Sequence, residues 1–192
     1  MISSLSKGFG DKINVAGILK NSLSNGPGMR YVLFVQGCPH HCDGCHNKHT
    51  WSFEENRLMT IDEVFNDIKE QLPLIQGVTF SGGEPFDQPY PLYVLAKRIK
   101  EELKINVMSY TGYTYDEIKG CSMFRDCDST YKNNLLDVLD ILVDGKFEKD
   151  NTKDAPKWAG SANQKIYFFN RPTKESVIKN LKERNRWVKN KL

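Results

Sequence analysis

Short apolar segments alternate with amphipathic ones along this chain, and this alternation limits the possible folds more than any other feature. The apolar segments are too short for helices and are rich in β-branched and aromatic residues, as expected for strands. Strands separated by helices predict repeated βα units and a parallel sheet. The expected strands cover residues 31–35, 77–80, 105–110, 140–145 and 165–169.

The helix that precedes the second of these strands has the clearest boundaries. Thr60 is a typical N-cap residue, and Glu63 three positions later completes a capping box. Pro73 ends this helix after residue 72. Its apolar stripe consists of Ile61, Val64, Phe65 and Ile68. Further helices are expected over residues 91–103, 134–138 and 173–190, the last with Thr173 as its cap.

The length of the chain limits how far such a sheet can close. A closed barrel of eight βα units takes about 250 residues, whereas this chain has 192. We therefore expect an incomplete, open parallel β/α barrel of about five to six strands, with its site at the carboxyl ends of the strands. A single domain, 1–192, would hold a core at 14–170 and a basic C-terminal helix at 173–190.

The composition is that of an ordinary globular protein, with 27% charged and 39% hydrophobic residues. No apolar run reaches the length that spans a bilayer, and the first residues lack the apolar stretch of a secretory signal. We expect a cytoplasmic protein with no membrane partner. Residues 171–192 carry eight Lys or Arg and two Glu, which a solvated helix face explains better than direct nucleic-acid binding.

Three of the five cysteines, Cys38, Cys42 and Cys45, lie in one run with the spacing C-x3-C-x2-C. Three thiolates on a short loop can hold three corners of an iron–sulfur cube and leave the fourth iron open to another ligand. However, His49 could complete a tetrahedral zinc site with the same three cysteines. The loop alone does not decide between these two metal sites.

A second chemical signal, Gly82, Gly83 and Glu84, follows the next expected strand. Residues without a side chain let the backbone approach a bound ligand closely, and a carboxylate can pair with an ammonium group. By itself, a Gly-Gly pair after a strand is usually only a turn. One βα unit after the cysteine run, it indicates a ligand with an amino group beside an open iron, such as a methionine-type moiety.

These two motifs together resemble the radical S-adenosylmethionine (SAM) superfamily, in which the position of Gly44 is often aromatic. Further blocks resemble one family within it, the anaerobic ribonucleotide reductase activating proteins. They are Asn25-Gly26-Pro27-Gly28-Met29-Arg30, the cysteine run extended through Asn47, Thr50 and Trp51, Tyr110-Thr111-Gly112-Tyr113-Thr114, Val143-Asp144-Gly145-Lys146-Phe147, and Gly160-Ser161-x-Asn163-Gln164.

The resemblance implies a 4Fe-4S cluster on Cys38, Cys42 and Cys45, with SAM bound to the fourth iron through its amino and carboxylate groups. Reductive cleavage of SAM would give methionine and a 5′-deoxyadenosyl radical, which would take a hydrogen atom from a backbone glycine of the large reductase chain. A reduced flavodoxin or ferredoxin would supply the electron. The SAM-binding residues so implied are Gly44, Cys45, His46, Gly82, Gly83, Glu84, Ser109 and Thr111.

Two rival functions share part of this pattern. An activase of another glycyl radical enzyme, such as pyruvate formate-lyase, would carry the same two motifs. A zinc-stapled module that binds nucleic acid or protein would use the zinc site and the basic tail. Cys121 and Cys127 are expected to be buried or idle thiols, because their spacing is not that of a second cluster. We expect His40 and His41 to shape the cysteine loop and Trp51 to pack beneath it.

Overall fold

The structure is a computed structural model that describes residues 10–120 and 127–169. Cys121, Thr173 and the basic helix expected at 173–190 lie outside the described residues, as does the side chain of Cys127. The strands and α-helices in chain order are β1 (Lys12–Ser22), β2 (Arg30–Val35), β3 (Arg57–Thr60), α1 (Ile61–Glu70), β4 (Gly77–Gly82), α2 (Pro89–Arg98), β5 (Asn106–Tyr110), α3 (Tyr115–Gly120), α4 (Cys127–Val138), β6 (Ile141–Asp144) and β7 (Lys165–Phe168). A π-helical turn, Ile99–Leu103, extends α2.

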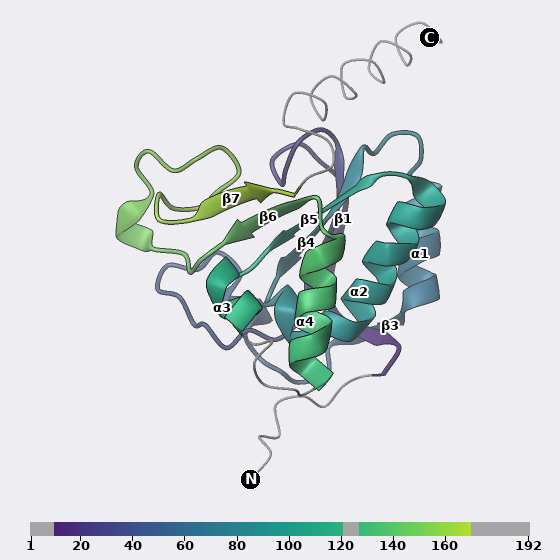
Figure 1. Cartoon of the computed structure of the whole chain (residues 1–192), viewed down its shortest axis with the longest axis horizontal. Helices are drawn as coiled ribbons and strands as arrows, with labels where there is room; N and C mark the ends of the chain where they lie inside the picture. Colours follow the sequence, from purple (N-terminus) through teal and green to yellow (C-terminus); the bar gives the residue numbers. More distant parts are fainter. Residues whose placement is uncertain (1–9, 121–126, 170–192) are drawn as a thin grey trace, which may run out of the picture.

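One seven-stranded sheet runs through the described residues, in the order β3-β1-β2-β4-β5-β6-β7 (Figure 1). The central strands β2, β4, β5 and β6 are parallel to one another. At one edge β1 pairs antiparallel with both β2 and β3, and at the other edge β7 pairs antiparallel with β6. The protein therefore has a mixed α/β fold with a parallel centre.

The edges of the sheet differ from the sequence-based expectation. Neither β1 nor β3 is predicted from the sequence, because β1 buries few apolar side chains and β3 has only four residues, so neither forms a clear apolar run. β7 is expected within the parallel series but runs antiparallel to β6. A parallel pair needs a crossover of a dozen or more residues, usually a helix, and the chain between β6 and β7 has only a short 3-10 turn, Lys149–Asn151.

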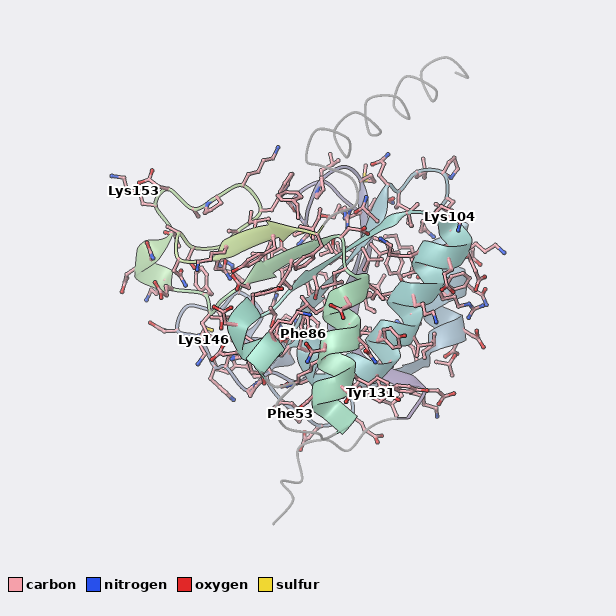
Figure 2. All side chains as sticks on the ribbon, viewed as in Figure 1. Phe53, Phe86, Lys104, Tyr131, Lys146 and Lys153 are labelled. Carbon is pink, nitrogen blue, oxygen red and sulfur yellow. The ribbon has the colours of Figure 1, made fainter. Side chains whose placement is uncertain are left out.

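Helices α1, α2 and α4 lie side by side along one face of the sheet (Figure 1). Because side chains alternate along a strand, every second residue of β2, such as Tyr31 and Leu33, shares a buried core with Val64 and Phe65 of α1. Phe86 belongs to the same core and lies inside the molecule in Figure 2. No helix in the described part of the chain is long and apolar enough to cross a membrane.

Arg30 closes the end of the sheet at which the parallel strands begin. Its fully buried guanidinium donates hydrogen bonds to Thr79 Oγ1 at 2.9 Å, to the side chain of Asn106 and to the carbonyl of Pro27 at 3.4 Å. Burial lowers the pKa of Arg30 to about 9. Protein groups therefore fill this end of the sheet, whereas ligands of open α/β sheets bind outside the carboxyl ends of the strands.

The start of α1 confirms the predicted capping box. Glu63 N donates to Thr60 Oγ1 at 3.2 Å, and Thr60 N donates to Glu63 Oε2 at 2.7 Å. These reciprocal bonds satisfy two backbone donors that the first helical turn would otherwise leave without partners. The helix they start buries the expected apolar stripe at Val64, Phe65 and Ile68.

We expect Thr60→Ala to lower the free energy of unfolding by about 1 kcal/mol, because Glu63 N loses its acceptor. Thr152→Ala is the matched control, since Thr152 is exposed and caps no α-helix; it should change that free energy by less than about 0.5 kcal/mol. Urea unfolding followed by circular dichroism measures both. Equal effects of the two substitutions would contradict the capping role.

Candidate active site

Three loops meet at the carboxyl ends of β2, β4 and β5, and the carboxylate of Glu84 joins them. Glu84 is 1% exposed. Its Oε1 accepts hydrogen bonds from Phe86 N and Thr111 Oγ1, both at 2.9 Å. Its Oε2 accepts from Gly112 N at 2.8 Å and from His40 Nε2 at 2.9 Å. One side chain therefore fixes the cysteine loop, its own loop and the loop after β5 relative to one another.

From the sequence, Glu84 is expected instead to hold the ammonium group of a ligand. A carboxylate has about four lone-pair sites, and four donors of the protein already reach the two oxygens of Glu84. Because a carboxylate can only accept, Nε2 is the ring nitrogen of His40 that carries the proton in this contact. In this structure Glu84 thus joins loops, and His40 shapes the cysteine loop as predicted.

The glycine pair before Glu84 is required by contacts within the protein. A Cβ added to Gly83 would lie 2.2 Å from Gly37 O, and one added to Gly82 would lie 2.7 Å from Val35 N. Gly82 also has a φ of +95°, in the left-handed region that favours glycine. Hydrogen bonds from Gly83 N to Val35 O and from Glu84 N to Gly37 O, both 2.7 Å, hold this close approach. The pair lets the exit of β4 lie directly against the cysteine loop.

Gly112, in the loop after β5, also allows a close approach to the cysteine loop. A Cβ at residue 112 would lie 2.3 Å from the ring of His40. That ring also meets the edge of Tyr113, with ring centroids 4.5 Å apart, and Tyr113 in turn donates to Asp87 Oδ1 at 2.9 Å. Burial, together with the nearby Glu84, raises the pKa of Asp87. The loop after β5 therefore packs closely on the cysteine loop through its glycine and its aromatic residue.

The three cysteines lie on one loop and form no disulfide. Cys38 is buried, while Cys42 and Cys45 are partly exposed. Backbone N–H groups of His40 and His41 donate to the sulfur of Cys38, and Asn47 N donates to the sulfur of Cys45 at 3.3 Å. Burial raises the pKa of the Cys38 thiol to about 12. Backbone donors aimed at sulfur are one of the means by which proteins stabilise iron–sulfur clusters and set their potentials.

The zinc alternative is not formed in this arrangement. Across residues 10–120 and 127–169, no three His, Cys, Asp or Glu side chains converge as a single metal ion requires. His49, the proposed fourth ligand, is exposed. A zinc ion needs all its ligand atoms within about 2.3 Å of one point, whereas each thiolate on a cube binds a different iron and the sulfur atoms can lie farther apart.

The segment after β6 covers the far part of the cysteine loop. The aliphatic part of Lys149 lies against Gly44, where a Cβ would come within 2.9 Å of it, and its ammonium is 3.8 Å from the carboxylate of Asp43. The ring of Phe147 lies 5.4 Å from that of His46. Figure 2 shows the neighbouring Lys146 at the same end of the sheet. Gly44 and His46 thus lie on the side of the loop that faces this segment, where His46 remains exposed.

Of the two remaining predicted site residues, Thr111 contacts Glu84 and Ser109 does not. Thr111 lies in the junction, bonded to Glu84. Ser109 does not reach it, because it is in register with Phe80 and Leu142, which belong to the core beneath the helices. Ser109 is fully buried on that face of β5.

Sequence reasoning did not identify Gly112 and Phe147 as part of this site. The signal for Gly112 was a glycine two residues after the end of β5, close to a strand exit as Gly83 is after β4. Phe147 stands in one of the blocks that resemble the family, but the block gives it no role, because only the folded segment brings it to His46.

Comparison with known proteins connects this site to a family. Residues 24–167 match the family model described as a 4Fe-4S single cluster domain. The chain is 40% identical over 154 residues to the anaerobic ribonucleoside-triphosphate reductase-activating protein of Pasteurella multocida, an alignment that covers 76% of this chain and 90% of that protein. The chain belongs to the family of anaerobic ribonucleoside-triphosphate reductase-activating proteins.

Other members of this reductase-activating family are similarly related. The protein of that name from Escherichia coli K12 is 36% identical over 151 residues, with 76% of this chain and 92% of that protein covered. The one from Enterobacteria phage T4 is 34% identical over 151 residues, with 74% and 86% covered. Among solved structures, QueE from E. coli aligns over 59% of each chain at 18% identity with a TM-score of 0.43, which is too low to bear on the fold.

The cysteine loop of this reductase-activating chain fits the cluster named by its family model. The loop offers three thiols without competing disulfides, and backbone donors to two of the three sulfurs. The Glu84 junction holds this loop in place through its contact with His40. The donor set of sulfur atoms is that of an iron–sulfur site.

We expect Gly83→Ala to lower the free energy of unfolding by about 1–3 kcal/mol, because the new methyl group must displace the backbone of the cysteine loop. The matched control is Gly17→Ala in β1, where a Cβ meets nothing within 4 Å. That control should leave the free energy of unfolding unchanged or slightly raised. Denaturant unfolding of the two variants measures the difference, and equal stability would show that the close approach at Gly83 is not needed.

Proposed function

We propose that this chain activates the large chain of an anaerobic ribonucleoside-triphosphate reductase by generating a free radical on one of its backbone glycines. The observation that carries this proposal is the junction of three loops, in which Glu84 holds a loop of three free cysteines against the exits of β4 and β5. The family of the chain names the reductase as the target of its relatives.

The cofactors would be a 4Fe-4S cluster on Cys38, Cys42 and Cys45, and SAM on the iron that no cysteine binds. When bound, the cluster would supply one electron to the sulfonium of SAM, whose carbon–sulfur bond would break to methionine and a 5′-deoxyadenosyl radical able to take a hydrogen atom from the target glycine. The protein's part is to hold the three thiols in place, to keep water from the buried Cys38, and to orient SAM.

SAM would lie where the three loops meet. Cys45 with Gly44 and His46 would line one side, and the Gly82-Gly83 backbone with Glu84 and Thr111 the other. Because the oxygens of Glu84 are filled, we assign it chiefly the positioning of Thr111 and Gly112. Ser109 is left out of the set, since it lies on the helix-covered face of β5.

The sheet would act as an incomplete barrel that is open to another protein. Its edge strands β3 and β7 lie at opposite ends of the strand order, and closure would require them to pair. An open side supports entry of a glycine-bearing loop of the large reductase chain. A reduced flavodoxin or ferredoxin would deliver the electron.

Incubation with candidate partners tests the function directly. The full chain is reconstituted with iron and sulfide under anaerobic conditions, reduced, and mixed with SAM and the large reductase chain. We expect 5′-deoxyadenosine together with a glycyl radical signal in electron paramagnetic resonance. The same mixture with pyruvate formate-lyase should give no glycyl signal. A signal there and none on the reductase would assign the chain to the other class of activase.

We expect Cys42→Ala to lose the cluster, because the three thiolates supply all of its protein ligands. Iron and sulfide content after reconstitution, with the visible absorbance of the cluster, measures this loss. His49→Ala is the matched control and should keep full iron content, since the exposed His49 is not a ligand in this assignment. Loss of metal in the His49 variant would return the zinc site to consideration.

A further inference from the structure

Trp51 carries a buried hydrogen-bond donor that has no acceptor. Its indole Nε1 is shielded from solvent and has no partner, and no other buried side-chain nitrogen or oxygen in residues 10–120 and 127–169 shares this condition. Burying an N–H group without an acceptor costs about 1–3 kcal/mol. Native structures rarely leave such a group unpaired, and a bound ion or water often explains it.

The donor lies beside the cysteine loop. The carbonyl of Trp51 accepts a hydrogen bond from Cys38 N at 3.2 Å. The indole ring lies against His41, with ring centroids 4.7 Å apart, and His41 stands between Cys38 and Cys42 in the chain. Trp51 is therefore fixed to the loop at its backbone and packed on it through its ring, as the sequence analysis expects.

We propose that Trp51 Nε1–H donates a hydrogen bond to a sulfur atom of the 4Fe-4S cluster. This inference rests on the proposed function, because the cluster would bring the acceptor that the protein lacks at this position. Hydrogen bonds to cluster sulfurs are among the factors that set its potential. Such a bond stabilises the reduced, more negative state, so Trp51 makes the cluster easier to reduce.

A buried water is the competing acceptor. Buried waters typically make about three hydrogen bonds to polar groups that lack other partners. No second buried side-chain nitrogen or oxygen of the described residues lacks a partner, so a water here would take its other hydrogen bonds from backbone groups. A cluster sulfur needs no further hydrogen-bond partners, and we therefore assign the donor to it.

The test compares reduction potentials of the reconstituted full chain, without SAM, by redox titration followed by electron paramagnetic resonance. Trp51→Phe keeps an aromatic ring on His41 and removes the N–H, so its midpoint should shift to a more negative potential. Trp158→Phe is the matched control and should titrate as the parent chain does. An unshifted midpoint in Trp51→Phe at full iron content would overturn the proposal. Failure of the parent chain to form any cluster would instead count against the proposed function.

A second measurement keeps Trp51 in place and therefore tests the hydrogen bond even if the Trp51→Phe variant does not fold. The chain holds three tryptophans, so a Trp158→Phe/Trp187→Phe double variant labelled with indole 15N carries the label at Trp51 alone. Hyperfine spectroscopy of its reduced cluster should show a coupling to this nitrogen and to its exchangeable proton. Absence of both couplings in a chain that holds the cluster would overturn the hydrogen bond.

Discussion

The buried carboxylate of Glu84 is the interaction on which the candidate site depends. Its four donors come from three separate loops, those after β2, β4 and β5. A hydrogen bond to a charged group contributes about 1.5–3 kcal/mol in favourable cases, and a buried carboxylate is tolerated only when it is satisfied in this way. The same contacts that stabilise Glu84 therefore fix the position of the cysteine loop.

The glycines around Glu84 follow from this junction. Gly83 lies against the carbonyl of Gly37, and Gly112 lies against the ring of His40. Both positions bring backbone from neighbouring strand ends so close that no side chain fits between them. The glycines thus allow this close packing, and the loops that they bring together are the ones that would hold SAM in the proposed function.

The parts of the fold that were predicted correctly are those that depend on residues close together in the sequence. The capping box at Thr60 and the apolar stripe of α1 depend only on neighbouring residues, so they can be recognised without a tertiary structure. The edges of the sheet were missed because the pairing of β1 with β3, and the direction of β7, depend on partners far away in the chain. The face on which Ser109 lies could not be predicted for a similar reason. Side chains alternate between the two faces of a strand, but only the packing of the helices decides which face they cover.

The sequence by itself determined the chemistry available to this protein: three thiols at C-x3-C-x2-C spacing, a glycine pair with a carboxylate after the next strand, and the blocks that match the reductase-activating family. Spacing along the chain is enough for this, because loop ligands of a cluster lie within a few residues of one another. Only the tertiary structure decided that the carboxylate of Glu84 accepts its hydrogen bonds from groups of the protein, and that the indole N–H of Trp51 is buried beside the cysteine loop. Both depend on contacts between segments that the order of residues does not reveal.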